Sequence, residues 1–166
     1  MAISPTFQRY LATKNVVYDI LVHEPTKSAM RTAEACRVSG DRVAKAVVLH
    51  DEYGYVLAIL PASHQIRLDD LRRQLGLDVD LAAEYEIEEL FDDCIPGAIP
   101  PVGECYGLET VVDDSIERQP EVYLEGGRPR DAGSHEPRAV RIAYRDSTAR
   151  HLQCSRLKIA GRHLHG

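Results

Sequence analysis

The segment from residue 43 to 61 constrains the fold more than any other part of the chain, because its pattern is that of a complete β-hairpin. Residues 43–49 form one apolar run, residues 51–54 have the Asp-first, Gly-last composition of a turn, and residues 55–60 form a second run closed by Pro61. Both runs are nearly continuous in apolar residues rather than alternating, which is typical of strands covered on both faces. The sequence therefore predicts a hairpin at the centre of a sheet.

Lys45 is the only charged residue in the first strand of this hairpin. A lysine is rarely buried unless its ammonium group is paired or points into a cleft. One interpretation is that the aliphatic stem packs on the sheet while the ammonium group reaches water at the rim. The other is that Lys45 is a cation in a pocket, suited to a ligand with an anionic or carbonyl group. The hairpin alone leaves both interpretations open.

The composition fits one globular domain. A chain of 166 residues with 44% hydrophobic content can bury roughly two thirds of its unfolded surface. We expect a single domain over residues 1–152 and a flexible tail over residues 153–166. No apolar run is long enough for a membrane span, and the first fifteen residues lack the apolar core of a signal peptide, so we expect a cytoplasmic protein.

The cysteines point to no metal or disulfide framework. They are scattered without a Cys-x-x-Cys pair, at Cys36, Cys94, Cys105 and Cys154. We expect them to be reduced thiols, and we expect neither a metal nor another cofactor.

The net charge of −6 is unevenly distributed along the chain. From residue 126 to the end, nine arginines and lysines stand against three carboxylates, which gives +6 and leaves −12 for the remainder. Residues 78–93 hold eight carboxylates and no basic residue, a pattern more typical of a solvated face than of a metal site. A basic segment on an acidic body can contact phosphates locally, but charge alone does not make it bind nucleic acid tightly.

Capping residues and apolar periodicity predict the other elements. Helices are expected from Ser4 to about residue 15, from residues 28–32 to Gly40, at 68–75, at 84–91 and at 146–151. Strands are expected at 16–22, 108–112, 121–125 and 139–144, with an acidic turn at 113–115. Because these elements intermix without a βαβ repeat, the expected fold is mixed α+β, with a mostly antiparallel mixed sheet and helices packed around it.

The uncharged loop at residues 95–103 contains three prolines and two glycines. One interpretation is a stiff connector. The other is a rigid wall that offers backbone N–H groups to a ligand, because the prolines have none and leave Gly97, Ala98 and Ile99 as a short row of donors. Glycine also lets a ligand approach the backbone closely.

Four segments occur in a distinctive order: HEPT at residues 23–26, TAEA at 32–35, VAKAVVL at 43–49 and PGAIPPVG at 96–103. Together they resemble the YbaK family, also called the prolyl-tRNA synthetase associated editing domain. The resemblance extends from about Ser4 to Arg145. It implies a twisted mixed sheet, partly closed into a barrel, with helices outside.

The resemblance also implies a site. Lys45 matches the family's pocket lysine, and Gly97 with Pro101 matches its Gly-x-x-x-Pro loop. The expected catalytic residues are Lys45 and the backbone donors Gly97 and Ala98. The other expected substrate-binding residues are His23, Thr26, Ser28, Met30, Ile99, Pro100, Pro101 and His135. The expected tRNA phosphate contacts are Arg128, Arg130 and Arg138.

By resemblance, the chain is a trans-editing aminoacyl-tRNA deacylase that hydrolyses the ester of mischarged tRNA. Such an ester is already activated, so a positioned water, an oxyanion site and a selective pocket suffice without a metal. We expect direct attack by water, assisted by the neighbouring ribose hydroxyl, rather than a covalent intermediate. The expected partner is the acceptor end of a mischarged tRNA, with an aminoacyl-tRNA synthetase as a second candidate partner.

The expected substrate carries a small amino acid such as alanine, serine or cysteine, with tRNA-Pro as one candidate, because a pocket of small and medium residues selects by exclusion. The alternative is a non-catalytic ligand-binding or regulatory module on the same fold. The C-terminal part leaves this alternative open. There, residues 133–135 align with the family's Gly–His pair only across an insertion, and Ser147 follows Asp146 where the family has phenylalanine.

Overall fold

The computed structural model describes residues 3–23, 26, 28–127, 138–143 and 157–159, with backbone alone for 138–140, 142–143 and 157–159. Its helices are α1 (Pro5–Thr13), α2 (Ala29–Cys36), α3 (Leu68–Leu75), α4 (Glu84–Leu90) and α5 (Asp114–Glu117), with 3₁₀ turns η1 (Gly40–Arg42), η2 (Pro96–Ala98) and η3 (Glu104–Tyr106). Its strands are β1 (Tyr18–Val22), β2 (Val43–His50), β3 (Tyr55–Pro61), β4 (Asp80–Leu81), β5 (Glu109–Asp113), β6 (Glu121–Glu125), β7 (Arg138–Ala143) and β8 (Leu157–Ile159).

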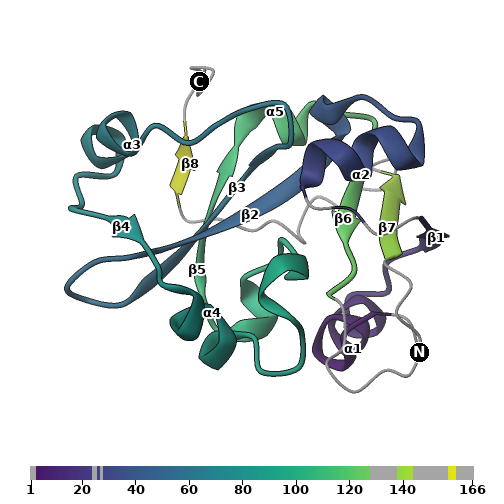
Figure 1. The fold of residues 1–166 in the computed structure, drawn as a ribbon, viewed down its shortest axis with the longest axis horizontal. Helices are drawn as coiled ribbons and strands as arrows, with labels where there is room; N and C mark the ends of the chain where they lie inside the picture. The colour runs from purple at the N-terminus through teal and green to yellow at the C-terminus, as the bar shows by residue number, and fades with distance from the viewer. Residues whose placement is uncertain (1–2, 24–25, 27, 128–137, 144–156, 160–166) are drawn as a thin grey trace.

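The strands form one mixed sheet in the order β1-β7-β6-β2-β3-β5-β8, with β4 paired to β2 outside this path. Figure 1 shows the long β2–β3 pair crossing the middle of the molecule. Four of the strand pairs are antiparallel and three are parallel. The predicted central hairpin and the mixed α+β class are confirmed. The expected partial closure into a barrel is wrong, because β1 and β8 end the path and no described ladder joins them.

Turn chemistry explains the hairpin. The Asp51 Oδ1 atom accepts hydrogen bonds from the N–H groups of Tyr53 (2.8 Å) and Gly54 (2.9 Å). The Asp51 N–H in turn donates to the Gly54 carbonyl at 2.9 Å. An aspartate that accepts from the backbone two and three residues ahead closes a turn locally. The turn therefore sets the register that places Lys45 opposite Leu60.

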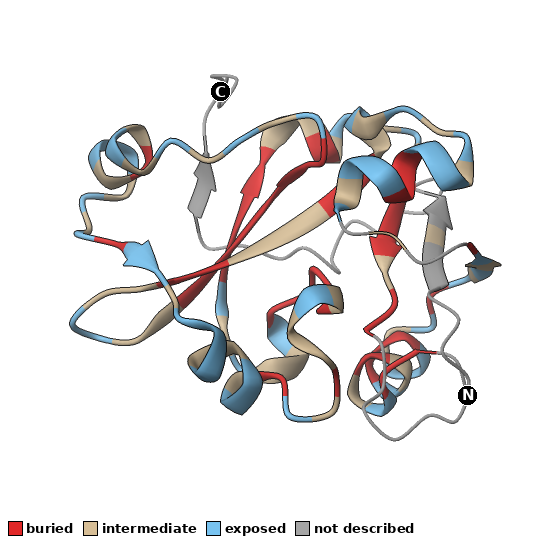
Figure 2. Cartoon of the chain, viewed as in Figure 1, coloured by how far each residue is buried: buried red, intermediate tan, exposed pale blue. Residues whose placement is uncertain are grey.

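Most of the buried hydrophobic residues lie in three clusters around the sheet, and Figure 2 shows many of them on β3, β5 and β6. The largest cluster packs α1 and the loop after α4 against one face of the sheet. A second cluster packs α3 against β2, β3 and β5, and a third packs α2 against β2 and β6. Helices therefore cover both faces, as the apolar runs of the hairpin predicted.

The end of α2 and the expected acidic turn at 113–115 differ from expectation. Helix α2 ends at Cys36 rather than at Gly40, because Arg37 takes the left-handed conformation (φ 56°). The Val38 N–H then bonds the Ala33 carbonyl at 3.0 Å, which closes the helix before it reaches Gly40. The expected acidic turn at 113–115 belongs to the short helix α5, capped by the Asp113 side chain. The expected helix at 146–151 lies outside the described residues.

The C-terminal region contains one described element that the sequence patterns did not indicate. Residues 157–159, within the expected tail, form β8 and pair in parallel with β5. The rest of the segment from residue 153 lies outside the described residues, so the domain bounds stay a prediction.

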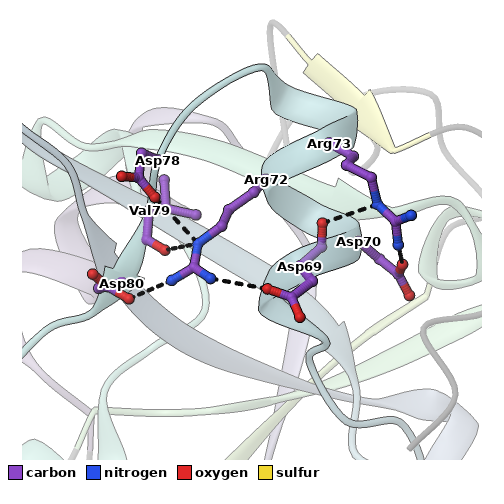
Figure 3. A network of polar contacts seen from close by, with 7 residues as sticks. All are labelled: Asp69, Asp70, Arg72, Arg73, Asp78, Val79 and Asp80. Carbon is purple, nitrogen blue, oxygen red and sulfur yellow. Dashed lines mark hydrogen bonds and ion pairs between the residues drawn. The ribbon is translucent and has the colours of Figure 1, made fainter.

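Arg72 on α3 connects that helix to β4. Its Nε donates to the Val79 carbonyl at 3.0 Å, and its guanidinium also contacts Asp69, Asp78 and Asp80 (Figure 3). The three carboxylates are mostly exposed, and exposed ion pairs of this kind stabilise little. The hydrogen bond to the carbonyl of Val79, whose side chain is fully buried, fixes the backbone that leads into β4.

The N-terminus of α1 holds together two segments that are distant in sequence. The Ser4 side chain caps the helix by accepting from the Phe7 N–H and bonds the Tyr106 hydroxyl at 2.9 Å. The Tyr106 hydroxyl also donates to Asp93, just before the 95–103 loop. The Ser4 N–H donates to the Gly126 carbonyl at 2.9 Å, just after β6. This contact joins the loop and the end of β6 to one fully buried residue.

Replacing Ser4 with alanine tests this junction. We expect Ser4→Ala to lower the free energy of unfolding by about 1–2 kcal/mol, because it removes a helix cap and a buried partner of Tyr106. Urea denaturation followed by far-UV circular dichroism measures the change. Ser39→Ala, at the exposed cap of η1, is the matched control and should change stability far less. Equal losses in the two variants would contradict a special role for Ser4.

Candidate functional site

A gap in the ladder of β2 defines the site. One edge of β2 pairs with β3 from Ala44 to His50. The other edge pairs with β6 at Val43 and Ala44 and with β4 at Leu49 and His50. Within the described part of the chain, residues 45–47 have no strand partner on this second edge. Figure 1 shows β6 beside one end of β2 and β4 beside the other.

Backbone polar groups of β2 face this gap. The Val48 carbonyl accepts from the Ala82 N–H at 2.9 Å across the second edge, whereas the Val43 carbonyl accepts from Ala62 on the β3 side. Alternate residues of a strand direct their N–H and C=O groups to the same edge. The N–H and C=O of Ala46 therefore face the gap and can bind a ligand there.

A cavity of about 350 Å³ lies at the gap. Its walls come from the start of α2, the middle of β2, the β4–α4 segment, the 95–103 loop and the end of β6. The lining residues are Thr26, Ser28, Ala29, Lys45, Ala46, Val47, Val48, Leu81, Ala82, Ile87, Pro96, Gly97, Ile99 and Glu125. Most of these side chains are apolar and small or medium in size, with a few polar groups among them, which is the usual composition of a small-molecule site.

Lys45 lines this cavity and is half-buried. Its ammonium group donates to the carbonyl oxygens of His64 and, at 3.5 Å, of Ala62. Among the described residues, no carboxylate lies within 4.0 Å of it. Burial lowers the pKa of Lys45 below the usual lysine value. These contacts favour the pocket-cation interpretation over an ammonium group directed to open water.

Glu125 is a site residue that the sequence analysis did not identify. It ends β6 and lines the cavity. Its Oε1 accepts from the Thr32 hydroxyl at 3.0 Å. Burial raises the pKa of the Glu125 carboxyl, while the Thr32 hydrogen bond and the charge of His23 act in the opposite direction. The sequence signal was weak, because a carboxylate that ends an apolar strand is usually solvated, unlike a charge inside the strand such as Lys45.

The 95–103 loop offers fewer backbone N–H donors to the cavity than expected. Gly97 and Ile99 line the cavity, as does Pro96. The Ala98 N–H donates to the Ile95 carbonyl at 3.1 Å in the 3₁₀ turn η2, so the structure contradicts the expectation that Ala98 is an available donor. Among described residues, the Gly97 N–H has no hydrogen-bond acceptor. The donor row is therefore reduced, and Gly97 is its exposed member.

Pro100 and Pro101 are buried and do not line the cavity. Gly127 shows how tightly Pro100 is packed, since a Cβ atom at Gly127 would lie 2.8 Å from the Ser4 Oγ and 3.1 Å from the Pro100 Cδ. Gly127 also has a positive φ of 71°, which favours glycine. The two prolines thus support the loop from behind, and their expected direct contact with substrate has no geometric support.

The structure brings together some of the remaining expected residues and not others. Thr26 and Ser28 line the cavity, and the Thr26 and Thr32 hydroxyl oxygens are 2.7 Å apart. His23 is buried beside Glu125 rather than at the cavity wall. Met30 does not line the cavity and lies against Gly40. His135, Arg128 and Arg130 lie outside the described residues, and Arg138 is described only as backbone in β7.

The raised pKa of Glu125 predicts how the free energy of unfolding depends on pH. Because the folded protein holds this proton more tightly, the free energy of unfolding should fall as pH rises from the ordinary glutamate pKa through the raised value. Glu125→Gln removes this titration and keeps an acceptor for Thr32. We expect it to be more stable than the wild type at pH 7.5, and the difference should shrink at pH 4.

Urea denaturation at the two pH values measures this difference. The other described titratable groups near Glu125 are His23, Lys45 and the Cys36 thiol, and the wild type and Glu125→Gln both retain them. Glu109→Gln, at the exposed start of β5, is the matched control and should show no such pH dependence. A stability difference that is the same at both pH values would contradict the prediction.

Two further features bear on the class of protein. In the part of the chain that the structure describes, no group of three or more His, Cys, Asp or Glu side chains could hold a metal ion. No described helix is long and apolar enough to cross a membrane.

The chain is similar to several solved structures. One is described as a proposed trans-editing enzyme for prolyl tRNA synthetase, with a TM-score of 0.71 and 23% identity over 93% of this chain and 96% of that one. Another comes from work on epitope backbone grafting onto scaffold proteins, with a TM-score of 0.70 and 20% identity over 91% and 92%. A third is the hypothetical protein APE2540, with a TM-score of 0.67 and 21% identity over 83% and 88%. At these identities the likeness shows a shared fold.

No protein with a curated description matches the chain. The match to a protein family is more informative, since it covers residues 23–141 and so contains β2, the 95–103 loop and Glu125. The chain belongs to the aminoacyl-tRNA editing domain family, also known as the YbaK family.

Proposed function

We propose that this protein is a trans-editing deacylase that hydrolyses the ester bond of tRNA mischarged with a small amino acid. Alanine, serine and cysteine are the candidate amino acids, and tRNA-Pro is a candidate carrier. The observation that carries the proposal is the cavity at the β2 gap, a mostly apolar space of about 350 Å³ that both Lys45 and Gly97 line. Family membership supports aminoacyl-tRNA as the substrate class.

The chemistry of an ester assigns a role to each wall. Water attack on the ester carbonyl produces an oxyanion, which a backbone N–H can stabilise. Gly97 is the proposed donor, because it is exposed at the cavity and Ala98 is occupied in η2. Lys45 is proposed to contact a phosphate of the terminal nucleotide. The neighbouring ribose hydroxyl is proposed to assist the attacking water.

The size of the cavity supports selection for small side chains. Ligand pockets commonly measure about 300–1,000 Å³, so this one is at the lower end and must also hold the ester and part of the ribose. The side chain would contact apolar groups such as Val48 and Ile87. Since an excess methylene in an apolar pocket costs only about 1–3 kcal/mol, we expect graded rather than absolute rejection of larger amino acids.

Charge supports one direction of approach for tRNA. The exposed carboxylates of α4, beside one wall of the cavity, repel phosphates. On the opposite wall, β6 ends at Glu125, and Arg128 and Arg130 follow closely in sequence. These arginines and Arg138 remain the proposed phosphate contacts. Few contacts on an acidic protein imply a shallow dependence of affinity on salt.

A screen of mischarged tRNAs tests the proposed function directly. We expect hydrolysis of alanyl-, seryl- or cysteinyl-tRNA and little action on tRNA charged with larger amino acids. Tight binding of charged tRNA without hydrolysis would instead support a non-catalytic binding module on the same fold. If the protein neither binds nor hydrolyses any charged tRNA, the proposal is overturned.

Replacing Lys45 tests the role of the cation. Lys45→Ala should lower kcat/KM for the best substrate by roughly 10- to 100-fold, which is the loss expected for a hydrogen bond to a charged group. The melting temperature should change little, because Lys45 is half-buried and its hydrogen bonds within the described residues are to two backbone carbonyls. Lys45→Arg should also be impaired, since a planar guanidinium does not occupy the same position. Lys14→Ala, at a surface ion pair, is the control, and full activity of Lys45→Ala would refute the assignment.

Gly97 permits a test that does not disturb the fold. A Cβ atom at Gly97 would meet no other atom within 4 Å, so Gly97→Ala should fold normally. If substrate lies against this backbone, turnover should fall by at least about tenfold, as when an oxyanion contact is weakened. Pro100→Ala is the control and should have a milder effect, because Pro100 supports the loop without reaching the cavity. Normal turnover by Gly97→Ala would indicate that the 95–103 loop is a connector and does not contact substrate.

A further inference from the structure

Two opposite charges start from neighbouring positions on one wall of the cavity. Ala44 on β2 pairs in parallel with Leu124 on β6, and this is the last pair of that ladder. Lys45 and Glu125 are the next residues on the two strands. Adjacent strands are about 4.8 Å apart, and residues in register project to the same face. Both side chains line the same cavity.

These charges do not neutralise each other. The Lys45 ammonium group turns toward the carbonyls of Ala62 and His64, and the Glu125 carboxylate turns toward Thr32 on α2. No ion pair joins them within 4.0 Å in the described part of the chain. Burial alone lowers the pKa of Lys45, and burial is the main cause of the raised pKa of Glu125. Each charge therefore loses hydration without gaining the other as a partner, which is unfavourable in the free protein.

A chain of hydroxyl groups fixes the carboxylate. The Thr32 hydroxyl is closer to the Glu125 Oε1 (3.0 Å) than to the Ser28 carbonyl (3.3 Å), so its proton is best placed toward the carboxylate. Thr26 must then donate to Thr32 across their 2.7 Å contact. Among described residues, the Thr32 hydroxyl is the only hydrogen-bond donor to the Glu125 carboxylate. The carboxylate is held in place with capacity for further donors from the cavity.

The substrate of the proposed reaction carries the complementary charges. An aminoacyl ester has an ammonium group on the carbon next to the ester carbonyl, and its nucleotide part has phosphate. An ammonium group has three N–H donors, which suit a carboxylate oxygen and a backbone carbonyl such as that of Ala46 facing the gap. An N-acylated or peptidyl ester lacks this charge and is bulkier at the same atom.

We propose that Glu125, held by Thr32, binds the free α-ammonium group of the aminoacyl ester and so restricts the enzyme to esters whose amino group is unblocked. This inference rests on the proposed function. Glu125 is then a specificity-determining residue that touches substrate, and Thr32 is a positioning residue. Lys45 and Glu125 together orient the ester through an anion-binding and a cation-binding group on the same wall of the cavity.

Matched esters with a free and an N-acetylated amino group test the proposal. We expect the wild type to prefer alanyl-tRNA over N-acetylalanyl-tRNA by at least about tenfold in kcat/KM, the loss typical of a hydrogen bond to a charged group. Glu125→Gln should raise KM for the free-amine ester and leave the N-acetylated ester nearly unchanged, so that the preference largely disappears. Thr32→Val should reduce the preference in the same direction but less, and Glu109→Gln should retain it.

Several outcomes would overturn the proposal. An equal rate of the wild type on both esters would do so, as would an equal fall in kcat for both esters in Glu125→Gln, which would indicate a role in chemistry or folding. If no charged tRNA is hydrolysed, the proposed reaction fails. The role of Glu125 is then tested by measuring the affinity for non-hydrolysable ligands. Calorimetry with a non-hydrolysable 3′-alanylamino-adenosine and its N-acetyl derivative should show the same preference, and an equal affinity for the two compounds would refute the ammonium site.

Discussion

The incomplete second edge of β2 is the constraint on which the site depends. A strand in the middle of a sheet normally has its backbone groups bonded on both edges. Here β6 leaves the ladder after Ala44 and β4 joins it only at Leu49, so a short stretch between them faces a cavity. The same interruption therefore creates the space and supplies the polar backbone groups that line it. Because β3 pairs with β2 throughout, the strand remains rigid behind the gap.

The walls of the cavity are fixed by contacts that lie outside it. Ser4 bonds the Gly126 carbonyl next to Glu125, and through Tyr106 and Asp93 it holds the start of the 95–103 loop. Arg72 bonds the Val79 carbonyl and so holds the backbone that leads into β4. These anchors come from α1 and α3, which do not line the cavity. Side chains and loops fixed in this way keep a binding geometry that the lining residues alone could not maintain.

Local signals explain what the sequence predicted well. The hairpin follows from a turn aspartate and two apolar runs, and α3 follows from its spacing of leucines and its terminal Gly76. Lys45 was recognisable because a charge in an apolar strand is unusual.

What escaped prediction depends on pairing between distant segments. The parallel β2–β6 ladder brings Glu125 beside Lys45 across about eighty residues of sequence, and no local pattern specifies that partner. The Ala98 N–H is occupied for a local reason, since the 3₁₀ turn at Pro96 uses it within the loop. Arg37 likewise replaced Gly40 as the end of α2, because a non-glycine residue there takes the left-handed conformation.

Charged side chains have different partners on the surface and in the cavity. Arg141 contacts both Asp19 and Glu121, and Arg72 contacts three aspartates, so these guanidinium groups meet their counter-charges within the protein. In the cavity, Lys45 and Glu125 stand on adjacent strands and each bonds neutral groups instead.

An ion pair between Lys45 and Glu125 would need no change of strand register, only a different direction of two side chains. The threonine hydroxyls on one side and the backbone carbonyls on the other oppose that change. A fold that holds two half-buried charges apart in this way loses some stability in the free protein and gains a site that is already arranged for a ligand with both charges.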